Sequence, residues 1–271
     1  MARRPHWTLD DIPYGEIDRD AIAGDRCVFH LIASASFIEI SSDAYTRNLV
    51  EYCSDEPEVV GWLKHGWEGE EVQHGLALRR YVETVWPEFD WERAYNSFMT
   101  EYARLCSLEF YAPTRALEMA ARCVVETGTS SFYRMLADAS HEPVLRKLAT
   151  FISNDEIDHY KHFYRYFRLY AVKERPSRWA IAKTLLARIA EVDNEDAAIA
   201  FKHVRLETHP DTPYSDAEYE DFRRFVRTWG MPHYKFDRAV RMVLKPMRLP
   251  GALARVAEQV GVGIARRRLC A

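Results

Sequence analysis

Apolar residues recur at a helical spacing along most of this chain. Val60, Leu63 and Trp67 are separated by three or four residues, and Leu145 and Leu148 begin a similar series. Such a series lines one face of a helix, whereas the two-residue alternation that is typical of strands is nowhere sustained. The pattern therefore predicts an all-α protein.

Prolines divide the first two thirds of the chain into long segments. Pro57, Pro87, Pro113 and Pro143 lie 30, 26 and 30 residues apart, and proline is favoured in the first turn of a helix. The long helices expected from this division are 22–54, 57–85, 90–111, 113–138 and 143–173. Shorter helices are expected near 177–191, 195–206, 215–229, 233–246 and 250–268.

The helices are expected to form one bundle with additions at both ends. We assign residues 1–21 to an N-terminal segment, 22–175 to the bundle, and 176–271 to a C-terminal helical extension packed on it. The stretch 206–215 contains two prolines and several turn-forming residues, so it is the best candidate for an internal linker.

The composition is that of a globular protein with nearly balanced charge. Of the 271 residues 48% are hydrophobic, and 37 Lys and Arg stand against 41 Asp and Glu, giving a formal net charge of −4. This balance gives no reason to expect nucleic acid as a partner. The longest uncharged run, 27–38, is shorter than the roughly 20 residues that a bilayer requires, and the first residues lack the apolar core of a signal peptide. We expect a cytoplasmic protein without a transmembrane helix.

Two Glu-x-x-His motifs carry the candidate chemistry. Glu71 precedes His74, and Glu156 precedes His159, by three residues. On a helix this offset places the carboxylate and the imidazole on one face, one turn apart. One such pair can hold a metal ion, but the motif alone is short and occurs by chance.

The positions of the two motifs relative to proline-marked turns strengthen the assignment. Glu71 lies 14 residues after Pro57 and Glu156 lies 13 residues after Pro143, while Glu39 precedes Pro57 by 18 residues and Glu126 precedes Pro143 by 17. At 1.5 Å per residue, all four carboxylates lie roughly 20–25 Å from the turns of two similar helical hairpins. Glu118, two turns before Glu126 on nearly the same face, is the alternative to that residue.

One Glu from each of two helices, with Glu-x-x-His from each of two others, is the ligand set of ferritin-like di-iron and di-manganese bundles. Such hard donors suit iron or manganese better than structural zinc. A ligating histidine normally donates its second N–H to a carboxylate, so we expect Asp155 to hold His74 and Glu70 to hold His159. The predicted ligands of two iron ions are Glu39, Glu71, His74, Glu126, Glu156 and His159.

The residues around both motifs resemble those of the soluble acyl-carrier-protein desaturases. The resemblance covers about residues 25–165, with a fainter similarity at Tyr219–Met231. It is carried by Asp155 and Glu156 with His159, by Glu126 followed by Thr129, and by the series Trp62, Trp67, Glu70, Glu71, His74, Gly75, Leu78 and Tyr81.

This resemblance implies a ferritin-like fold, a di-iron centre that activates O2, and a fatty-acyl substrate on acyl carrier protein or another thioester. It also implies a ferredoxin-type electron donor, and places Thr129 beside the oxygen-binding face of the metals. Nothing in the sequence identifies the residues that would line an acyl channel, so substrate length and the choice among desaturation, hydroxylation and N-oxidation stay open.

Two other functions use a similar bundle. A di-iron N-oxygenase that oxidises aryl amines adds a third histidine one turn before the last Glu, where this chain has Ile152. A non-catalytic or peroxide-scavenging ferritin-like protein that binds or stores iron is the other alternative. The long C-terminal extension and the absence of a Cys-x-x-Cys rubredoxin module make iron storage and a rubrerythrin-type peroxidase less favoured.

The C-terminal region is locally basic and amphipathic. From Arg238 to the end there are eight Lys or Arg and one Glu, and Leu253, Val256, Val260 and Ile264 form an apolar stripe. Three interpretations stay open: a docking site for an acidic carrier protein or ferredoxin, contact with an anionic membrane surface, and a stripe packed on the bundle. The oligomeric state is also open, a homodimer being the commonest arrangement.

Overall fold

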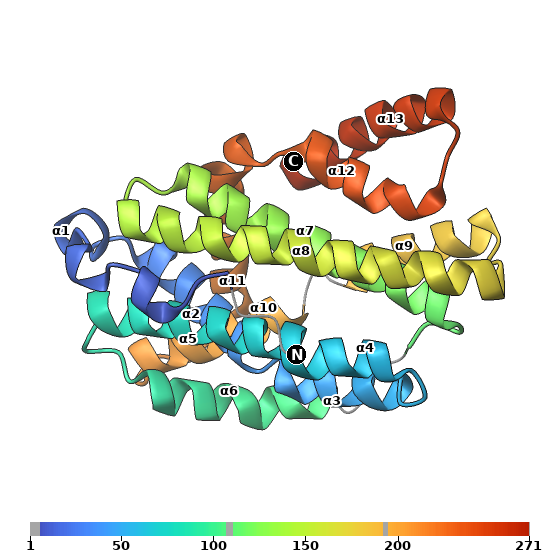
Figure 1. Ribbon diagram of the computed structural model, residues 1–271. Coiled ribbons are helices and arrows are strands. Elements are labelled where there is room, and N and C mark those ends of the chain that lie inside the picture. Colours follow the sequence, from blue (N-terminus) through green and yellow to red (C-terminus); the bar gives the residue numbers. More distant parts are fainter. Residues whose placement is uncertain (1–5, 107–110, 192–194, 271) are drawn as a thin grey trace. The chain divides into compact units, whose positions relative to one another are not determined.

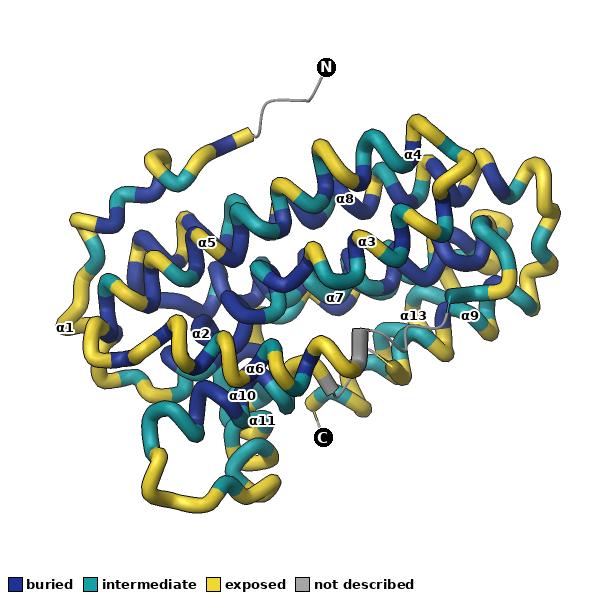
Figure 2. Tube along the Cα trace, turned by 90° about the horizontal axis from the view of Figure 1, so that it is seen from below, coloured by how far each residue is buried: buried dark blue, intermediate teal, exposed yellow. Residues whose placement is uncertain are grey.

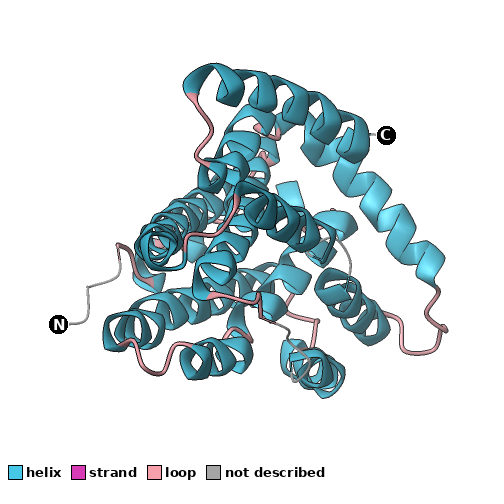
Figure 3. Ribbon diagram, turned by 90° about the vertical axis from the view of Figure 1, so that its right-hand side faces the viewer, coloured by secondary structure: helices cyan, strands magenta, loops and turns pink. Residues whose placement is uncertain are grey.

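The computed structural model describes residues 6–106, 111–191 and 195–270. Helices connected by short turns make up these residues, and no β-strand occurs among them (Figure 3). Buried and exposed positions alternate along the helices with the period of an amphipathic face, as α5 and α8 show in Figure 2. The prediction of an all-α protein is confirmed.

The chain forms two compact units, which we describe separately. One unit contains Met1–Glu109, Ser140–Leu148 and Asn194–Phe225, and the other contains Phe110–Ala139, Ala149–Asp193 and Val226–Ala271. Two helices, α8 and α11, contribute residues to both units. The three-part division expected from the sequence, with boundaries after 21 and 175, stays a prediction.

The first unit is built around the antiparallel neighbours α2 and α5, which are in extensive contact (Figure 1). Helix α10 packs on α2 and on α6. The helical elements of this unit are η1 (Leu9–Asp11), η2 (Tyr14–Glu16), α1 (Arg19–Ile22), α2 (Arg26–Ile40), α3 (Asp43–Tyr52), α4 (Pro57–Trp62), η3 (Leu63–Trp67), α5 (Glu68–Val85), α6 (Trp91–Cys106), the start of α8 (Pro143–Glu174), α10 (Glu195–Thr208) and most of α11 (Asp216–Gly230).

The N-terminal segment is packed against α5. The hydroxyl of Tyr14 donates a hydrogen bond to the carbonyl oxygen of Ala77 at 3.1 Å, and Gln73 Nε2 donates to the carbonyl oxygen of Trp7 at 3.1 Å. Trp7 and Tyr14 are both buried. Residues before α1 therefore complete the core beside the first Glu-x-x-His motif.

The second unit contains the other candidate ligand helices. Helix α7 packs on α9 and on α12, and α12 packs on α13. Its helical elements are α7 (Arg115–Ala139), most of α8, α9 (Arg178–Glu191), the end of α11, η4 (Met231–His233), α12 (Phe236–Leu244), η5 (Lys245–Met247) and α13 (Gly251–Cys270).

The predicted helix 22–54 is wrong in detail, because the structure has two helices there. The first begins at Arg26, where the Asp25 carboxylate accepts hydrogen bonds from the amides of Cys27 and Val28 and so caps the helix. It ends at Ile40, and the hydroxyl of Ser41 donates to the carbonyl oxygen of Ile38. A serine that bonds to nearby backbone in this way competes with helix continuation.

The stretch Arg26–Tyr52 also bears on the membrane question. By length and composition alone it could cross a bilayer, with a mean hydropathy of 1.2 in its most apolar window. However, 67% of that window is buried, and the core helix of a soluble protein has the same properties. This stretch therefore does not establish a membrane span, and the location of the protein stays a prediction.

Candidate metal centre

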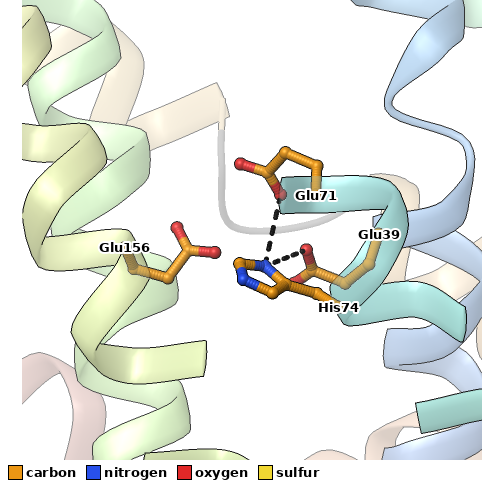
Figure 4. Close-up of side chains that lie close together, drawn as sticks. All are labelled: Glu39, Glu71, His74 and Glu156. Carbon is orange, nitrogen blue, oxygen red and sulfur yellow. Dashed lines mark ion pairs between the residues drawn. The ribbon is translucent and has the colours of Figure 1, made fainter. Parts of the chain in front are cut away.

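The first candidate ligand group is assembled within the first unit, from α2 and α5. One donor atom from each of Glu39, Glu71 and His74 lies within 4.8 Å of the other two. His74 Nδ1 is 3.6 Å from Glu39 Oε2 and 3.8 Å from Glu71 Oε2, as the dashed lines in Figure 4 mark. The offset of three residues places Glu71 and His74 on one face of α5, and that face is turned toward Glu39 on α2.

Gly75 allows α2 and α5 to approach closely beside this group. A Cβ atom at position 75 would lie 2.4 Å from the backbone nitrogen of Ile40 and 2.6 Å from its Cβ. Only glycine fits so close to a neighbouring backbone without a shift of the helices. Because Ile40 follows Glu39 and Gly75 follows His74, the close contact fixes the distance between these two donors.

Two aromatic residues beside the first group were not identified from the sequence. The Trp7 ring is parallel to the His74 ring, with an interplanar angle of 2° and a centroid distance of 6.1 Å. Tyr45 packs against Trp67, and its pKa is raised well above the usual value, first by burial and then by negative charges that include Glu71 and Glu39. No sequence signal connects Trp7 to His74, since 67 positions separate them.

The helix leading to Glu71 contains one wide turn. The stretch Leu63–Trp67 forms a π-helical turn that joins α4 to α5 and ends four residues before Glu71. Such turns insert one extra residue into an α-helix and are frequent at functional sites. The predicted helix 57–85 is thus confirmed in extent, with an irregular turn that the apolar spacing does not reveal.

The second candidate ligand group is assembled within the second unit and repeats the distances of the first. His159 Nδ1 is 3.6 Å from Glu126 Oε2 and 3.8 Å from Glu156 Oε2. One donor atom from each of these three residues lies within 4.8 Å of the other two. Each unit therefore combines a single Glu on one helix with Glu-x-x-His on another, at matching separations. We call these groups the first triad (Glu39, Glu71, His74) and the second triad (Glu126, Glu156, His159).

Thr129 contacts the second triad directly. Its hydroxyl oxygen is 2.6 Å from Glu156 Oε2, to which it donates a hydrogen bond. The remaining bonds of this hydroxyl are longer and go to backbone carbonyl oxygens of its own helix. The threonine singled out by the sequence thus orients one carboxylate of the triad.

Glu118, the alternative to Glu126, has a different environment. It is fully buried, and its carboxylate is 2.8 Å from Arg122 Nε and accepts a hydrogen bond from the amide of Ala112. Arg188 Nη2 lies 3.9 Å away. Glu118 is therefore neutralised by arginine, whereas Glu126 lies beside His159, so the geometry favours Glu126 as the metal-binding residue.

The carboxylates of both triads are withdrawn from water. The exposed fractions are 6% for Glu39, 5% for Glu71, and 1% for each of Glu126 and Glu156. Burial raises the pKa of Glu126 to about 8, against the opposite effect of the neighbouring His159. A buried carboxylate without a compensating cation is costly, so these groups require protons or a metal ion nearby.

The donor separations fit a metal ion. Distances of 3.6 and 3.8 Å are too long for hydrogen bonds, but two ligands that each lie about 2.1 Å from one ion are separated by roughly 3 to 4 Å. Carboxylate and imidazole donors without thiolate suit iron or manganese. Buried carboxylate and histidine groups that could hold a metal ion are thus present in both units.

The two carboxylates that were predicted to hold the histidines, Asp155 and Glu70, occupy different environments. Asp155 is buried at 4% exposure, whereas Glu70 is half-buried. Their predicted partners, His74 for Asp155 and His159 for Glu70, belong to the opposite unit in each case. These two pairings stay predictions.

The chain was compared with known protein families, with curated proteins and with solved structures. None of the three comparisons found a match. The ferritin-like fold and the resemblance to the desaturases therefore stay predictions from the sequence.

Proposed function

We propose that this protein is a di-iron, O2-dependent oxidoreductase that acts on a fatty-acyl thioester, in the manner of the acyl-carrier-protein desaturases. The observation that carries the proposal is the repetition of one buried triad in both units with the same donor separations, 3.6 and 3.8 Å. A structural ion pair has no reason to recur with equal chemistry, equal helical offset and equal distances.

In this proposal the two triads supply one dinuclear centre inside a ferritin-like bundle. The support is the combined donor set of four carboxylates and two imidazoles, which is that of di-iron carboxylate bundles. Further support is the position of the ligands along the chain, at nearly equal offsets from Pro57 and Pro143. Two divalent ions would also offset the four carboxylates, which otherwise repel one another.

The chain's own residues hold and shape the centre. Four carboxylates and two imidazoles would bind the ions, and Thr129 orients Glu156 through its hydroxyl. Gly75 keeps Glu39 close to His74, while Trp7 covers the His74 ring. Protein side chains lack the oxidising power for this reaction. Bound iron would supply it, together with O2 and two external electrons.

The substrate class is proposed from the motifs that resemble acyl-carrier-protein desaturases, and the electron donor from the same resemblance. The aryl-amine alternative is less favoured, because the position of its third histidine is occupied by Ile152, which is fully buried. An acyl chain attached to a carrier protein or to coenzyme A, with a ferredoxin as donor, is the combination to be tested.

The test is a metal analysis followed by a turnover assay on the full chain. We expect about two irons per chain, and an absorption band that bleaches on anaerobic reduction and returns with O2. The reduced protein is then given acyl-carrier thioesters, ferredoxin and O2, and the acyl chains are analysed by mass spectrometry for loss of two hydrogens. An aryl amine is assayed in parallel.

The matched variants are Glu71→Ala and Glu83→Ala on the same helix. Glu71 is a proposed ligand, whereas Glu83 is partly exposed and pairs with Arg79 on the surface. Only Glu71→Ala should lose iron and turnover. A wild-type protein that takes up neither iron nor manganese after reconstitution would contradict the enzyme proposal, and consumption of the aryl amine alone would contradict the acyl substrate.

A further inference from the structure

Helix α13 exposes an apolar stripe to solvent. Leu253, Val256, Val260 and Ile264 follow one another at spacings of three and four residues, and their exposed fractions lie between 52% and 61%. One interpretation left open by the sequence was that this stripe packs on the bundle. That interpretation is wrong for the described structure, in which the four side chains are exposed. A row of four large aliphatic side chains in water is unusual for a soluble surface.

The opposite side of α13 is the one that packs on α12. A Cβ atom at Gly261 would lie 2.8 Å from Val240 Cγ1, and Glu258 Oε2 lies 3.7 Å from Arg241 Nε. Glu258 lies on the side of α13 opposite the stripe, and Gly261 lies between that side and the stripe. One face of this helix therefore packs on α12, and the apolar stripe stays exposed to solvent.

A neighbouring helix of the same unit exposes further apolar residues. Trp179 and Leu186 on α9 have exposed fractions of 77% and 66%. Helix α9 contacts η5, just before α13, and Arg178 Nη2 donates a hydrogen bond to the carbonyl oxygen of Arg248 at 3.3 Å. We call the exposed apolar residues of α9 and α13, with the cations around them, the α9–α13 surface.

Exposed cations lie on the same two helices and at the junction of α8 with α9. The exposed cations are Lys173, Arg175, Arg178, Lys183, Arg255, Arg266, Arg267 and Arg268. The acidic residues nearby are engaged elsewhere: Glu258 lies close to Arg241, Glu174 accepts the amide of Ala116, and Glu191 pairs with Arg188. The surface therefore combines aliphatic groups, one exposed tryptophan and a local excess of cations on a protein whose net charge is −4.

We propose that the α9–α13 surface binds the interface of an anionic lipid bilayer, with α13 lying in the plane of the headgroups. Aliphatic side chains would enter the acyl boundary, Trp179 would occupy the interfacial layer, and the arginines would contact lipid phosphates. Arg267 and Arg268 follow Ile264 by three and four residues and so flank the end of the stripe. A helix with this distribution is typical of peripheral membrane binding, and the inference is independent of the metal centre.

An acidic protein is the less favoured occupant. A partner protein would need a complementary apolar groove for a stripe about three turns long, together with acidic residues around it, and would bury the exposed Trp179 as well. A bilayer interface offers both properties over any area. Charge and apolar exposure on two neighbouring helices thus favour lipid.

The experiment is vesicle flotation of the full, metal-loaded chain. We expect the protein to float with phosphatidylcholine vesicles that contain about one third phosphatidylglycerol, and not with phosphatidylcholine alone. Binding should weaken when NaCl is raised from about 0.05 M to about 0.5 M. Arg267→Gln should lower the partition coefficient about fivefold, and Ile264→Gln should lower it at both salt concentrations.

The controls make the same kinds of substitution, a cation to glutamine and an aliphatic residue to glutamine, at exposed positions of the first unit. Arg19→Gln removes the same charge from α1, and Leu76→Gln replaces a partly exposed leucine of α5. Neither should change flotation. The proposal is overturned if the protein does not bind anionic vesicles at low salt, or if the controls weaken binding as much as the α13 variants. A concentration-dependent dimer that Ile264→Gln abolishes would assign the stripe to a second copy instead.

Discussion

Thr129 shows how one hydroxyl group can determine the orientation of a metal ligand. Its bond to Glu156 Oε2, at 2.6 Å, is short because the acceptor is a carboxylate. Thr129→Val keeps the shape of the side chain and removes the donor. Since residues that orient ligands typically contribute 10–100-fold to metal affinity, we expect a loss of roughly that size. Iron release to a competing chelator measures it.

The matched control is Thr127→Val on the same helix. The Thr127 hydroxyl donates only to the carbonyl oxygen of Cys123, within α7, so this variant should keep wild-type iron affinity. Thr129→Ser should restore most of the affinity because it restores the donor. Equal iron release from Thr129→Val and Thr127→Val would show that the bond to Glu156 has no role in binding.

His30 gives the clearest pH dependence among the residues outside the triads. Burial lowers its pKa from 6.5 to about 4, with the nearby Arg26 adding to the effect. Because the folded pKa lies below the unfolded one, the unfolded chain binds more protons between pH 4 and 6.5, and stability falls as the pH decreases through that range. The ring packs against Phe29 and Phe201 and stays neutral there.

Replacement of His30 by glutamine should remove this pH dependence. We compare the free energy of unfolding of the wild type with that of His30→Gln. The wild-type value minus the variant value should be about 2 kcal/mol lower at pH 5 than at pH 8. Urea unfolding of the metal-free proteins at both pH values provides the measurement. A difference between the two proteins that is the same at pH 5 and pH 8 would contradict the assigned pKa.

The Glu-x-x-His pair of each triad was predictable because its spacing is local. Glu71 and His74 share a helix face by geometry alone, and so do Glu156 and His159. Trp7 was not predictable, since its contact with His74 depends on how the N-terminal segment packs. The choice between Glu118 and Glu126 also required coordinates, because only these show that Arg122 already neutralises Glu118.

At the scale of helices, the approach of α2 to α5 depends on one residue. Gly75→Ala would place a methyl group 2.4 Å from the nitrogen of Ile40, so the two helices would have to separate. Overpacking of this kind costs about 1–3 kcal/mol or more. It should also move Glu39 away from His74, so we expect a lower melting temperature together with reduced iron content.

Gly69→Ala on the same helix is the matched control. No atom lies within 4 Å of a Cβ built at Gly69, so alanine should stabilise the helix by about 0.5–1 kcal/mol. Thermal unfolding and iron analysis of both variants distinguish the two effects. Wild-type stability and iron content in Gly75→Ala would mean that the close contact does not determine the ligand geometry.

Apolar spacing and proline predicted where helices lie far better than they predicted where helices are interrupted. The predicted helix 143–173 is observed as Pro143–Glu174, and 215–229 as Asp216–Gly230. The break after Ile40 and the wide turn at Leu63–Trp67 were missed, since no glycine or proline marks the first and the apolar period continues through the second. Both irregularities are local changes in backbone hydrogen bonding, which a periodic apolar pattern does not encode.

At the scale of the whole molecule, the sequence predicted two similar hairpins but not their assignment to two compact units. Each unit contains one complete triad, and each triad combines residues from helices distant along the chain, as with Glu39 and His74. Apolar periodicity identifies which face of a helix is buried. It does not identify the partner of that face, so the grouping of 194–225 with the first unit needed coordinates.

Variants that each lack one histidine distinguish one dinuclear centre from two separate metal sites. His74→Ala removes a ligand from the first triad only, and His159→Ala from the second only. If the triads together would hold one dinuclear centre, either variant should lose most of both irons and the O2-dependent absorption change. Two independent sites would instead leave about one iron per chain in each variant, and that result would contradict the di-iron proposal.

Both variants should stay folded by circular dichroism, because in a chain of 271 residues the apolar core and not the metal supplies most of the stability. The exposed His65→Ala, on the turn before α5, controls for loss of a histidine and should retain two irons.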